Sequence, residues 1–475
     1  MIALVNEKKV ESFSALGATE LKPRADAITF ARVFLGCSNI ASAFRSGAKI
    51  VFSGKVGQSA LVLGALVSKF NWSMSNYELL AKGAIVGHIL EQGSGQISEF
   101  MQTRFLKRSI FVAECFSSGN AIFSKFGDGI VTVSSMIETL FSGVVNPQSH
   151  HFPDVTVDLS SVFFEAVGVN RVRVDGATGY CPSSFYQASL NRDRGYALVG
   201  LLFIYGVDCQ RKAAAIGRSV LENANIALTT HRFEPIMEYA IDVLGNGNEC
   251  CLRVGVVHAR VDALDAAMLE IRNALISTAP VVVLGSITGP FPYGLVQRVF
   301  IKKTWLDTNE NDVGSCSQSL QKPYQSNTVI TPVHFGTEIV VPLSVIAYGR
   351  SSSVGNGVTI VIIARSKELF AVLLREATLE KIQEHLHGHG HLHENGERHS
   401  HLRSIDHGHG DLQQRCQRQE AFRFEVPGLS LVNVVLTDVL GPICIDLEGK
   451  TFAQRIFSMK IRVPKEMIPK EESKL

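Results

Sequence analysis

The chain has 475 residues, 46% hydrophobic and 19% charged, which is typical of a globular protein with more than one core. Its formal net charge is only +2, and no basic face with interspersed aromatic residues is evident, so we expect no nucleic-acid partner. The longest apolar run, residues 196–207, is too short to cross a bilayer, so we also expect no membrane partner. The nine cysteines include no CxxC pair, which indicates reduced thiols.

The first informative stretch is residues 48–72, AKIVFSGKVGQSALVLGALVSKFNW, which predicts a strand at 50–52, a loop, and a helix over 58–70. A second helix follows, because Ser75 and Glu78 have capping-box spacing and Gly93 is a natural stop. This alternation predicts an α/β domain over residues 1–152 with a partly parallel sheet.

The loop before the first helix is a candidate anion site. Free amides at a helix start favour a negative charge, and a lysine adds to that field. The residues in question are Ser53, Gly54, Lys55 and Gly57. The GxxxxGK[ST] order of a Walker loop is absent, and a simple glycine-rich turn explains the stretch equally well.

The second helix carries a candidate catalytic pair. His88 and Glu91 are three residues apart and therefore share a helix face. A carboxylate can fix an imidazole tautomer and raise its basicity, as a general base requires. A structural ion pair near the helix end is the other reading of the same spacing.

From residue 153 the pattern changes. Short β-like runs separated by Gly, Pro and Asn fill the first part of residues 153–303, and two further strands and two helices follow, which predicts a strand-rich mixed α/β continuation. Residues 304–336 are rich in Ser, Gln, Asn and Pro and read as a linker. Residues 337–464 predict a smaller α+β module, with strands at 339–348 and 358–365 and a helix over 367–386.

The module contains a second candidate anion site in YGRSSSVGNG, residues 348–357. Its backbone amides, a guanidinium and hydroxyl groups could hold an oxyanion. The candidate ligand-binding residues are Arg350, Ser351, Gly355 and Asn356. No Ser–His–acid arrangement can be inferred for these serines.

A histidine-rich insert, residues 385–420, holds nine of the fifteen histidines. Its histidine stretch, residues 384–411, is rich in glycine and lacks cysteine and apolar anchors, so we expect a spacer loop with no specific metal site. The last segment, residues 465–475, ends in Ser473, Lys474 and Leu475. At a free carboxyl terminus this tripeptide is a peroxisomal import signal, so we expect an import receptor as a partner and a peroxisomal (or related microbody) location, or a cytoplasmic one if the signal is unused.

Several stretches together resemble the acyclic terpene utilisation (AtuA-like) family. They are PDVTVDLSSVFFEAVGVNRVRVDG with GATGYCPSSFYQASL, SGKVGQSALVLGALVSKFNW, GHILEQG, GRSSSVGNGVTIVIIAR and DLEGKTFAQRIFSMKIRVP. The resemblance implies a C-terminal ferredoxin-like domain and a link to degradation of branched terpenoid acids or acyl-CoA. It also implies that the chain begins partway through the family's first α/β domain, so that a longer chain or a completing partner would supply the rest.

Two loops depart from the family pattern. Gln58 stands where the family has Asp, and Ser352, Ser353 and Val354 stand where it has Gly-Asp-Lys. If those charges act on a substrate, Ser and Val cannot replace them. Three functions therefore stay open: an enzyme or binder of an anionic metabolite or acyl-CoA, a non-catalytic assembly partner, and, least favoured, a metal buffer. No cofactor is expected, and a homo-oligomer is possible.

Overall fold

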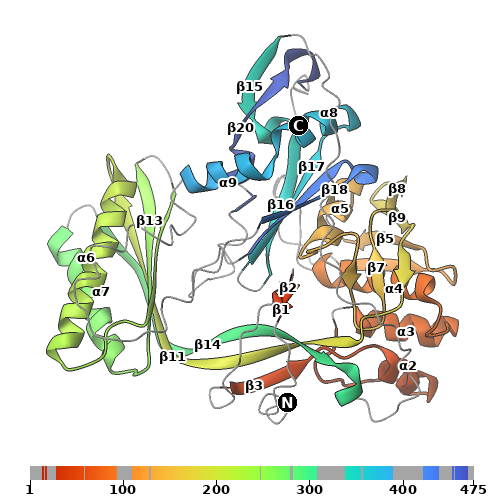
Figure 1. The fold of residues 1–475 in the computed structure, drawn as a ribbon, viewed down its shortest axis with the longest axis horizontal. Coiled ribbons are helices and arrows are strands. Elements are labelled where there is room, and N and C mark those ends of the chain that lie inside the picture. The colour runs from red at the N-terminus through yellow and green to blue at the C-terminus, as the bar shows by residue number, and fades with distance from the viewer. Residues whose placement is uncertain are drawn as a thin grey trace.

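Figure 1 shows a computed structural model, which describes residues 13–14, 17–18, 28–57, 59–93, 110–127, 130–245, 248–278, 282–306, 337–354, 357–388, 421–437, 452–453 and 455–468. These residues form an N-terminal lobe, a distal lobe and a C-terminal domain. The linker over 307–336, most of the histidine-rich insert and the final tripeptide lie outside the described residues. No helix among the described residues is long and apolar enough to cross a membrane.

The N-terminal lobe packs helices against two small antiparallel sheets. Its helices are α2 (Ser38–Arg45), α3 (Ala60–Phe70), α4 (Tyr77–Gly93) and α5 (Val133–Phe141). One sheet has the order β4 (Ile110–Cys115), β5 (Ala121–Phe126), β9 (Arg171–Asp175), β8 (Phe163–Gly168), and the other the order β10 (Thr178–Tyr180), β7 (Thr156–Asp158), β6 (His150–His151). Short strands β1 (Phe13–Ser14) and β2 (Gly17–Ala18) form a separate hairpin.

Two 21-residue strands connect this lobe to the distal lobe (Figure 1). They are β11 (Phe185–Tyr205) and β14 (Val282–Lys302), which pair antiparallel with register shifts that include one between Asp193 and Tyr196. The near half of β11 also pairs with β3 (Ile28–Val33). The β-like segments FYQASL (185–190) and ALVGLLFIYG (197–206), two of the short runs in the first part of residues 153–303, therefore belong to one strand, because a bulge carries the polar stretch between them.

The distal lobe has a split βαββαβ topology. Its elements follow the chain order β11, α6 (Cys209–Thr230), β12 (Glu238–Leu244), β13 (Glu249–His258), α7 (Ala263–Thr278), β14. The sheet order is β12-β13-β11-β14, and both helices cover one face. The helix α6 connects β11 to β12, which have β13 between them, and α7 connects β13 to β14, which have β11 between them. Adjacent strands of the sheet are therefore antiparallel throughout.

The C-terminal domain is a four-stranded sheet with helices on one face. The sheet has the order β16 (Ala347–Val354), β17 (Gly357–Ala364), β19 (Leu431–Leu436), β18 (Ala421–Val426). The helices are α8 (Lys367–Glu376) and α9 (Leu379–Gly388), and β15 (Glu338–Pro342) pairs with β20 (Lys460–Pro464). One-turn helices η2 (Lys303–Trp305), η4 (Leu343–Val345), η6 (Pro427–Leu429) and η7 (Lys465–Met467) complete the described elements.

This sheet packs on both faces, which fixes the domain against the N-terminal lobe. Ile360 and Ile362 of β17 face α8 and α9, whereas Val361 and Ile363 join the core of the N-terminal lobe. All eight residues of β17 are consequently buried. Asn433 of β19 adds a hydrogen bond from Nδ2 to the carbonyl of Val144 at 2.9 Å.

The mixed α/β class is confirmed, but three details differ from the sequence predictions. Ile50 and Phe52, in the predicted strand 50–52, are 75% and 97% exposed and lie in a loop. Among the described residues the only parallel pairing is a single bridge between Leu35 and Val56. The predicted helix 367–386 is two helices, because the helical conformation is interrupted between Glu376, where α8 ends, and Leu379, where α9 begins.

Candidate functional site

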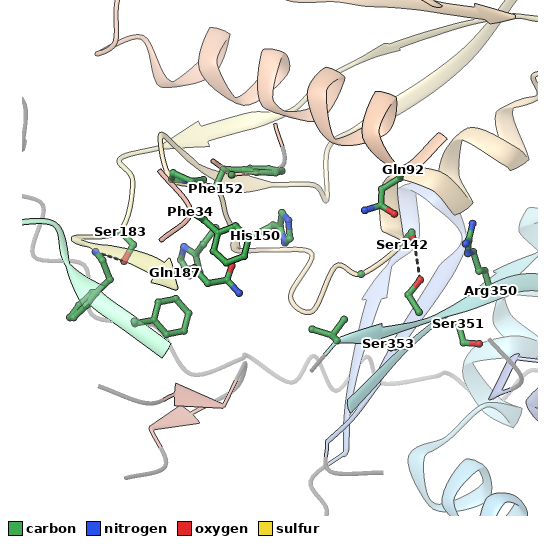
Figure 2. Close-up of a pocket in the computed structure, with 18 residues that line it drawn as sticks. Phe34, Gln92, Ser142, His150, Phe152, Ser183, Gln187, Arg350, Ser351 and Ser353 are labelled. Atoms are coloured by element: carbon green, nitrogen blue, oxygen red, sulfur yellow. Dashed lines mark hydrogen bonds between the residues drawn. The ribbon is translucent and has the colours of Figure 1, made fainter. Parts of the chain in front are cut away.

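A cavity of about 370 Å³ lies where the N-terminal lobe, the β11–β14 ribbon and β16 meet (Figure 2). Its size falls at the lower end of the usual range for ligand pockets, about 300–1,000 Å³. The lining residues come from all three parts of the structure: Phe34, Gly57, Gln92, Ser142, Gly143, His150, His151, Phe152, Pro153, Ser183, Phe185, Gln187, Phe300, Arg350, Ser351, Ser352, Ser353 and Val354.

Pro153 forms part of one wall and is held from two sides. A Cβ atom on Gly57 would lie 2.6 Å from the Pro153 ring, so only glycine permits this approach. Lys303 donates a hydrogen bond from Nζ to the Pro153 carbonyl at 2.6 Å. The predicted anion loop therefore reaches the cavity through Gly57.

Asp154 anchors the same segment from the side of the core. Its carboxylate accepts hydrogen bonds from the backbone amide of Cys37 at 2.9 and 3.0 Å, at the start of α2. Burial raises the pKa of Asp154, and the Cys37 amide and Lys303 oppose that rise. We assign this carboxylate a structural role, since its acceptor atoms are engaged at a helix start.

His88 lies behind the cavity wall and is only 2% exposed. Its Nε2 is 3.0 Å from the Leu140 carbonyl, which can only accept, so Nε2 carries the proton. Nδ1 is buried without a hydrogen-bond partner among the described residues. Burial lowers the pKa of His88 to about 4, although the Leu140 hydrogen bond opposes the shift.

The predicted catalytic pair, in which Glu91 would orient the imidazole of His88, is therefore not what the structure shows. The Leu140 carbonyl, rather than Glu91, fixes the His88 tautomer. Glu91 is exposed. Its pKa is raised, because partial withdrawal from water outweighs the opposing effect of the charge of Lys55. The neighbour of Glu91 on α4, Gln92, is the residue that lines the cavity.

The other residues of the first loop lie at the margin of the site. Lys55 places Nζ 5.2 Å from the ring centre of Phe34, which is a lining residue. Ser53 and Gly54 are exposed and do not line the cavity. Lys55 therefore contributes positive charge beside the cavity rather than within it.

The second predicted loop is mostly strand β16, so its side chains alternate between two faces. Arg350 lines the cavity, and Ser352 shares a hydrogen bond with Ser142 at 2.7 Å between the two hydroxyl oxygens. Ser351 is buried and accepts a hydrogen bond from the amide of Ala453 at 3.0 Å, so its hydroxyl anchors the domain as well as bordering the cavity. Gly355 and Asn356 lie outside the described residues.

The described lining of the cavity combines one guanidinium with apolar surface. Of its described lining residues, Arg350 is the cation and none is Asp or Glu. Four phenylalanines give it apolar surface: Phe34, Phe152, Phe185 and Phe300. No group of three or more possible metal ligands occurs among the described residues.

Sequence reasoning missed His150 and the aromatic wall. His150 packs edge-on against Phe152, with ring centres 4.7 Å apart, and against His88 at 5.8 Å. The signal was the stretch SHHFPD, in which two histidines and an aromatic residue come directly before Pro153 and Asp154. Nothing in that stretch alone shows that it faces Arg350.

Comparison with known proteins agrees with this architecture. The family model "Acyclic terpene utilisation family protein AtuA" matches residues 3–309, and that of the AtuA ferredoxin-like domain matches residues 341–462. No curated protein and no solved structure matches the chain. Because the first match covers well over half of the chain, the protein belongs to the acyclic terpene utilisation family AtuA and carries the ferredoxin-like domain of that family.

Proposed function

We propose that this AtuA-family protein binds a small anionic metabolite in the cavity between the N-terminal lobe and β16. The observation that carries the proposal is the position of Arg350 in a cavity whose described lining residues include four phenylalanines and no acid. A guanidinium in a partly dry site recognises a carboxylate strongly, and aromatic side chains accept a branched hydrocarbon. The ligand is therefore a branched or terpenoid acid, or the acyl part of an acyl-CoA thioester that carries a second, free carboxylate.

The size of the cavity limits what it can enclose. A volume of about 370 Å³ suits a small acid or an acyl chain rather than a whole coenzyme A thioester. If the ligand is a thioester, its nucleotide end lies outside, where Lys55 offers positive charge beside Phe34. Reaction chemistry is left open by this proposal.

The first test is ligand-induced stabilisation. Wild-type protein is expected to show a higher melting temperature with millimolar branched acids or their CoA thioesters, because binding to the folded state shifts unfolding by mass action. Arg350→Met should weaken affinity by at least about tenfold, since it removes a charge-assisted hydrogen bond. Differential scanning fluorimetry over a ligand titration measures both effects.

A matched control is Arg218→Met, which removes an exposed guanidinium from α6 in the distal lobe. This variant should respond to ligand as wild type does. An unchanged response in Arg350→Met would contradict the proposed site.

We further propose that the protein acts in peroxisomal catabolism of branched acyl compounds, supported by the terminal residues Ser473, Lys474 and Leu475. A fluorescent protein fused to the amino terminus of the chain is expected to enter peroxisomes. Deleting the three residues should leave it in the cytosol, whereas deleting residues 389–415 of the histidine-rich insert should not change import. Import that persists without the tripeptide would refute this part of the proposal.

One observation favours a second candidate, a non-catalytic binding or assembly partner. Ser352, directly before the two positions where the family carries Asp and Lys and this chain has Ser353 and Val354, uses its hydroxyl to bond Ser142 across the domain junction at 2.7 Å. An uncharged contact that joins domains suits a scaffold at least as well as proton transfer. Absence of stabilisation by every acid and thioester tested would favour this candidate.

A further inference from the structure

The cavity has two polar ends with aromatic rings at one of them (Figure 2). One end holds Arg350, Gln92 and Ser142. The other holds His150 and Gln187, close to Phe34 and Phe152. A monofunctional acid bound at Arg350 would leave the second polar end without a partner.

His150 is the titratable hydrogen-bonding group at that second end, and its ring is held in place. Its ring is held by Phe152 at 4.7 Å and an interplanar angle of 82°, and by His88 at 5.8 Å and 61°. His150 as a whole is half-buried and lines the cavity, so its imidazole is accessible to a ligand there. Phe152 and His88 are themselves 5% and 2% exposed, so the imidazole is backed by fixed neighbours. The imidazole therefore offers a ligand oxygen a hydrogen-bonding group whose position is already fixed.

The charge state of His150 narrows the class of oxygen that fits. Burial, followed by the nearby His88 and His151, lowers the pKa of His150 to about 3. The ring is therefore neutral at physiological pH, with one N–H donor and one acceptor nitrogen. A neutral imidazole suits an uncharged carbonyl or hydroxyl oxygen, whereas a second carboxylate would prefer a cation.

We propose that the ligand is an acid with a second, uncharged oxygen function, its carboxylate at Arg350 and its oxo or hydroxy group hydrogen-bonded to His150. This inference rests on the proposed function, because it assumes that the cavity binds an acid. It adds the position of a second oxygen in the ligand and identifies His150 as the residue that recognises this oxygen.

The test uses pairs of acids that differ only in this oxygen. Dissociation constants are measured by ligand-observed NMR for pentanoate against 4-oxopentanoate and for hexanoate against 5-oxohexanoate. Wild type is expected to bind at least one oxo acid about tenfold more tightly than its partner, the size of one buried hydrogen bond. The neutral ketone 2-pentanone should bind much more weakly than either five-carbon acid, because it lacks the carboxylate.

Two variants assign the preference to His150. His150→Phe keeps an aromatic ring, so binding of pentanoate should remain while the preference for 4-oxopentanoate disappears. His150→Gln keeps a donor and an acceptor and should retain part of the preference. Because the cavity wall could be disturbed, melting temperatures of both variants are measured, and the inference is judged on the variant that folds as wild type does.

The outcomes separate the two proposals. Equal binding of both acids in each pair overturns this inference and leaves the proposed function standing. A preference that survives in the folded His150 variants also overturns it. Failure of these four acids to bind wild type overturns this inference, and failure of the branched acids and thioesters as well overturns the proposed function itself.

Discussion

Lowering the pH from 7 to 5 is expected to destabilise the N-terminal lobe by about 3 kcal/mol through His88 and His150 alone. Burial lowers the pKa values of these histidines to about 4 and about 3 in the folded protein, whereas an unfolded chain has values near 6.5. As the pH falls below about 6.5, the two histidines bind protons in the unfolded chain but stay unprotonated in the folded lobe. The stability that the neutral histidines contribute above that pH is therefore lost as the pH falls toward 4.

The measurement compares wild type with the double variant His88→Gln, His150→Gln, in which neither position titrates. Trp72 is 5% exposed in the N-terminal lobe, so its fluorescence reports urea unfolding of this lobe once the second tryptophan is replaced by Trp305→Phe in both proteins. The midpoint should fall more steeply with acid in wild type than in the double variant. The comparison between the two proteins is needed because Asp154, whose pKa is raised, makes acid stabilising rather than destabilising, and it does so equally in both. Parallel pH profiles would show that the two histidines are not held neutral.

The sequence predicted the helices of the N-terminal lobe because their signals are local. α4 ends at Gly93 as expected, although Asn76 rather than Ser75 caps its start by accepting from the amide of Leu79 at 3.3 Å. α3 occupies Ala60–Phe70, close to the predicted 58–70. Caps and apolar periodicity lie within a few residues of each other and can be read along the chain.

Strand pairing could not be predicted in the same way. Alternation of strands and helices in residues 1–152 predicted a partly parallel sheet, but the strands of the N-terminal lobe, such as β4 with β5 and β6 with β7, pair antiparallel. The apolar triplet at 50–52 has the pattern of a strand, yet Phe52 is 97% exposed and none of the described strands pairs with this segment. Both outcomes depend on contacts between segments that are distant along the chain.

The candidate site likewise combines residues that the sequence could indicate with residues whose role depends on distant contacts. Gly57 and Arg350 were singled out separately, and the structure brings both to one cavity. His150 was not singled out, because its significance comes from Phe152, His88 and the opposite wall rather than from its neighbours in sequence. Lys55 was predicted to bind the ligand, but it lies over the Phe34 ring and is not among the described lining residues.

Replacing Gly179 with alanine is expected to cost about 3 kcal/mol or more in stability, because it forces two backbones apart. Gly179 lies in β10, and a Cβ atom built there would be 1.8 Å from the carbonyl oxygen of Tyr77, in the first turn of α4. The nearest atoms are backbone, so no side-chain rotation relieves the overlap. α4 would have to move, and with it Gln92 and His88 at the other end of the helix.

Gly54→Ala is the matched control, since nothing lies within 4 Å of a Cβ atom at Gly54. Urea unfolding followed by Trp72 fluorescence should show a large loss of stability in Gly179→Ala and almost none in Gly54→Ala. Ligand binding should also weaken in Gly179→Ala at temperatures where it is still folded, because α4 positions Gln92 at the polar end of the cavity. Equal stability of the two variants would mean that α4 and β10 are less closely packed than the 1.8 Å approach implies, and the placement of His88 behind the cavity would lose its support.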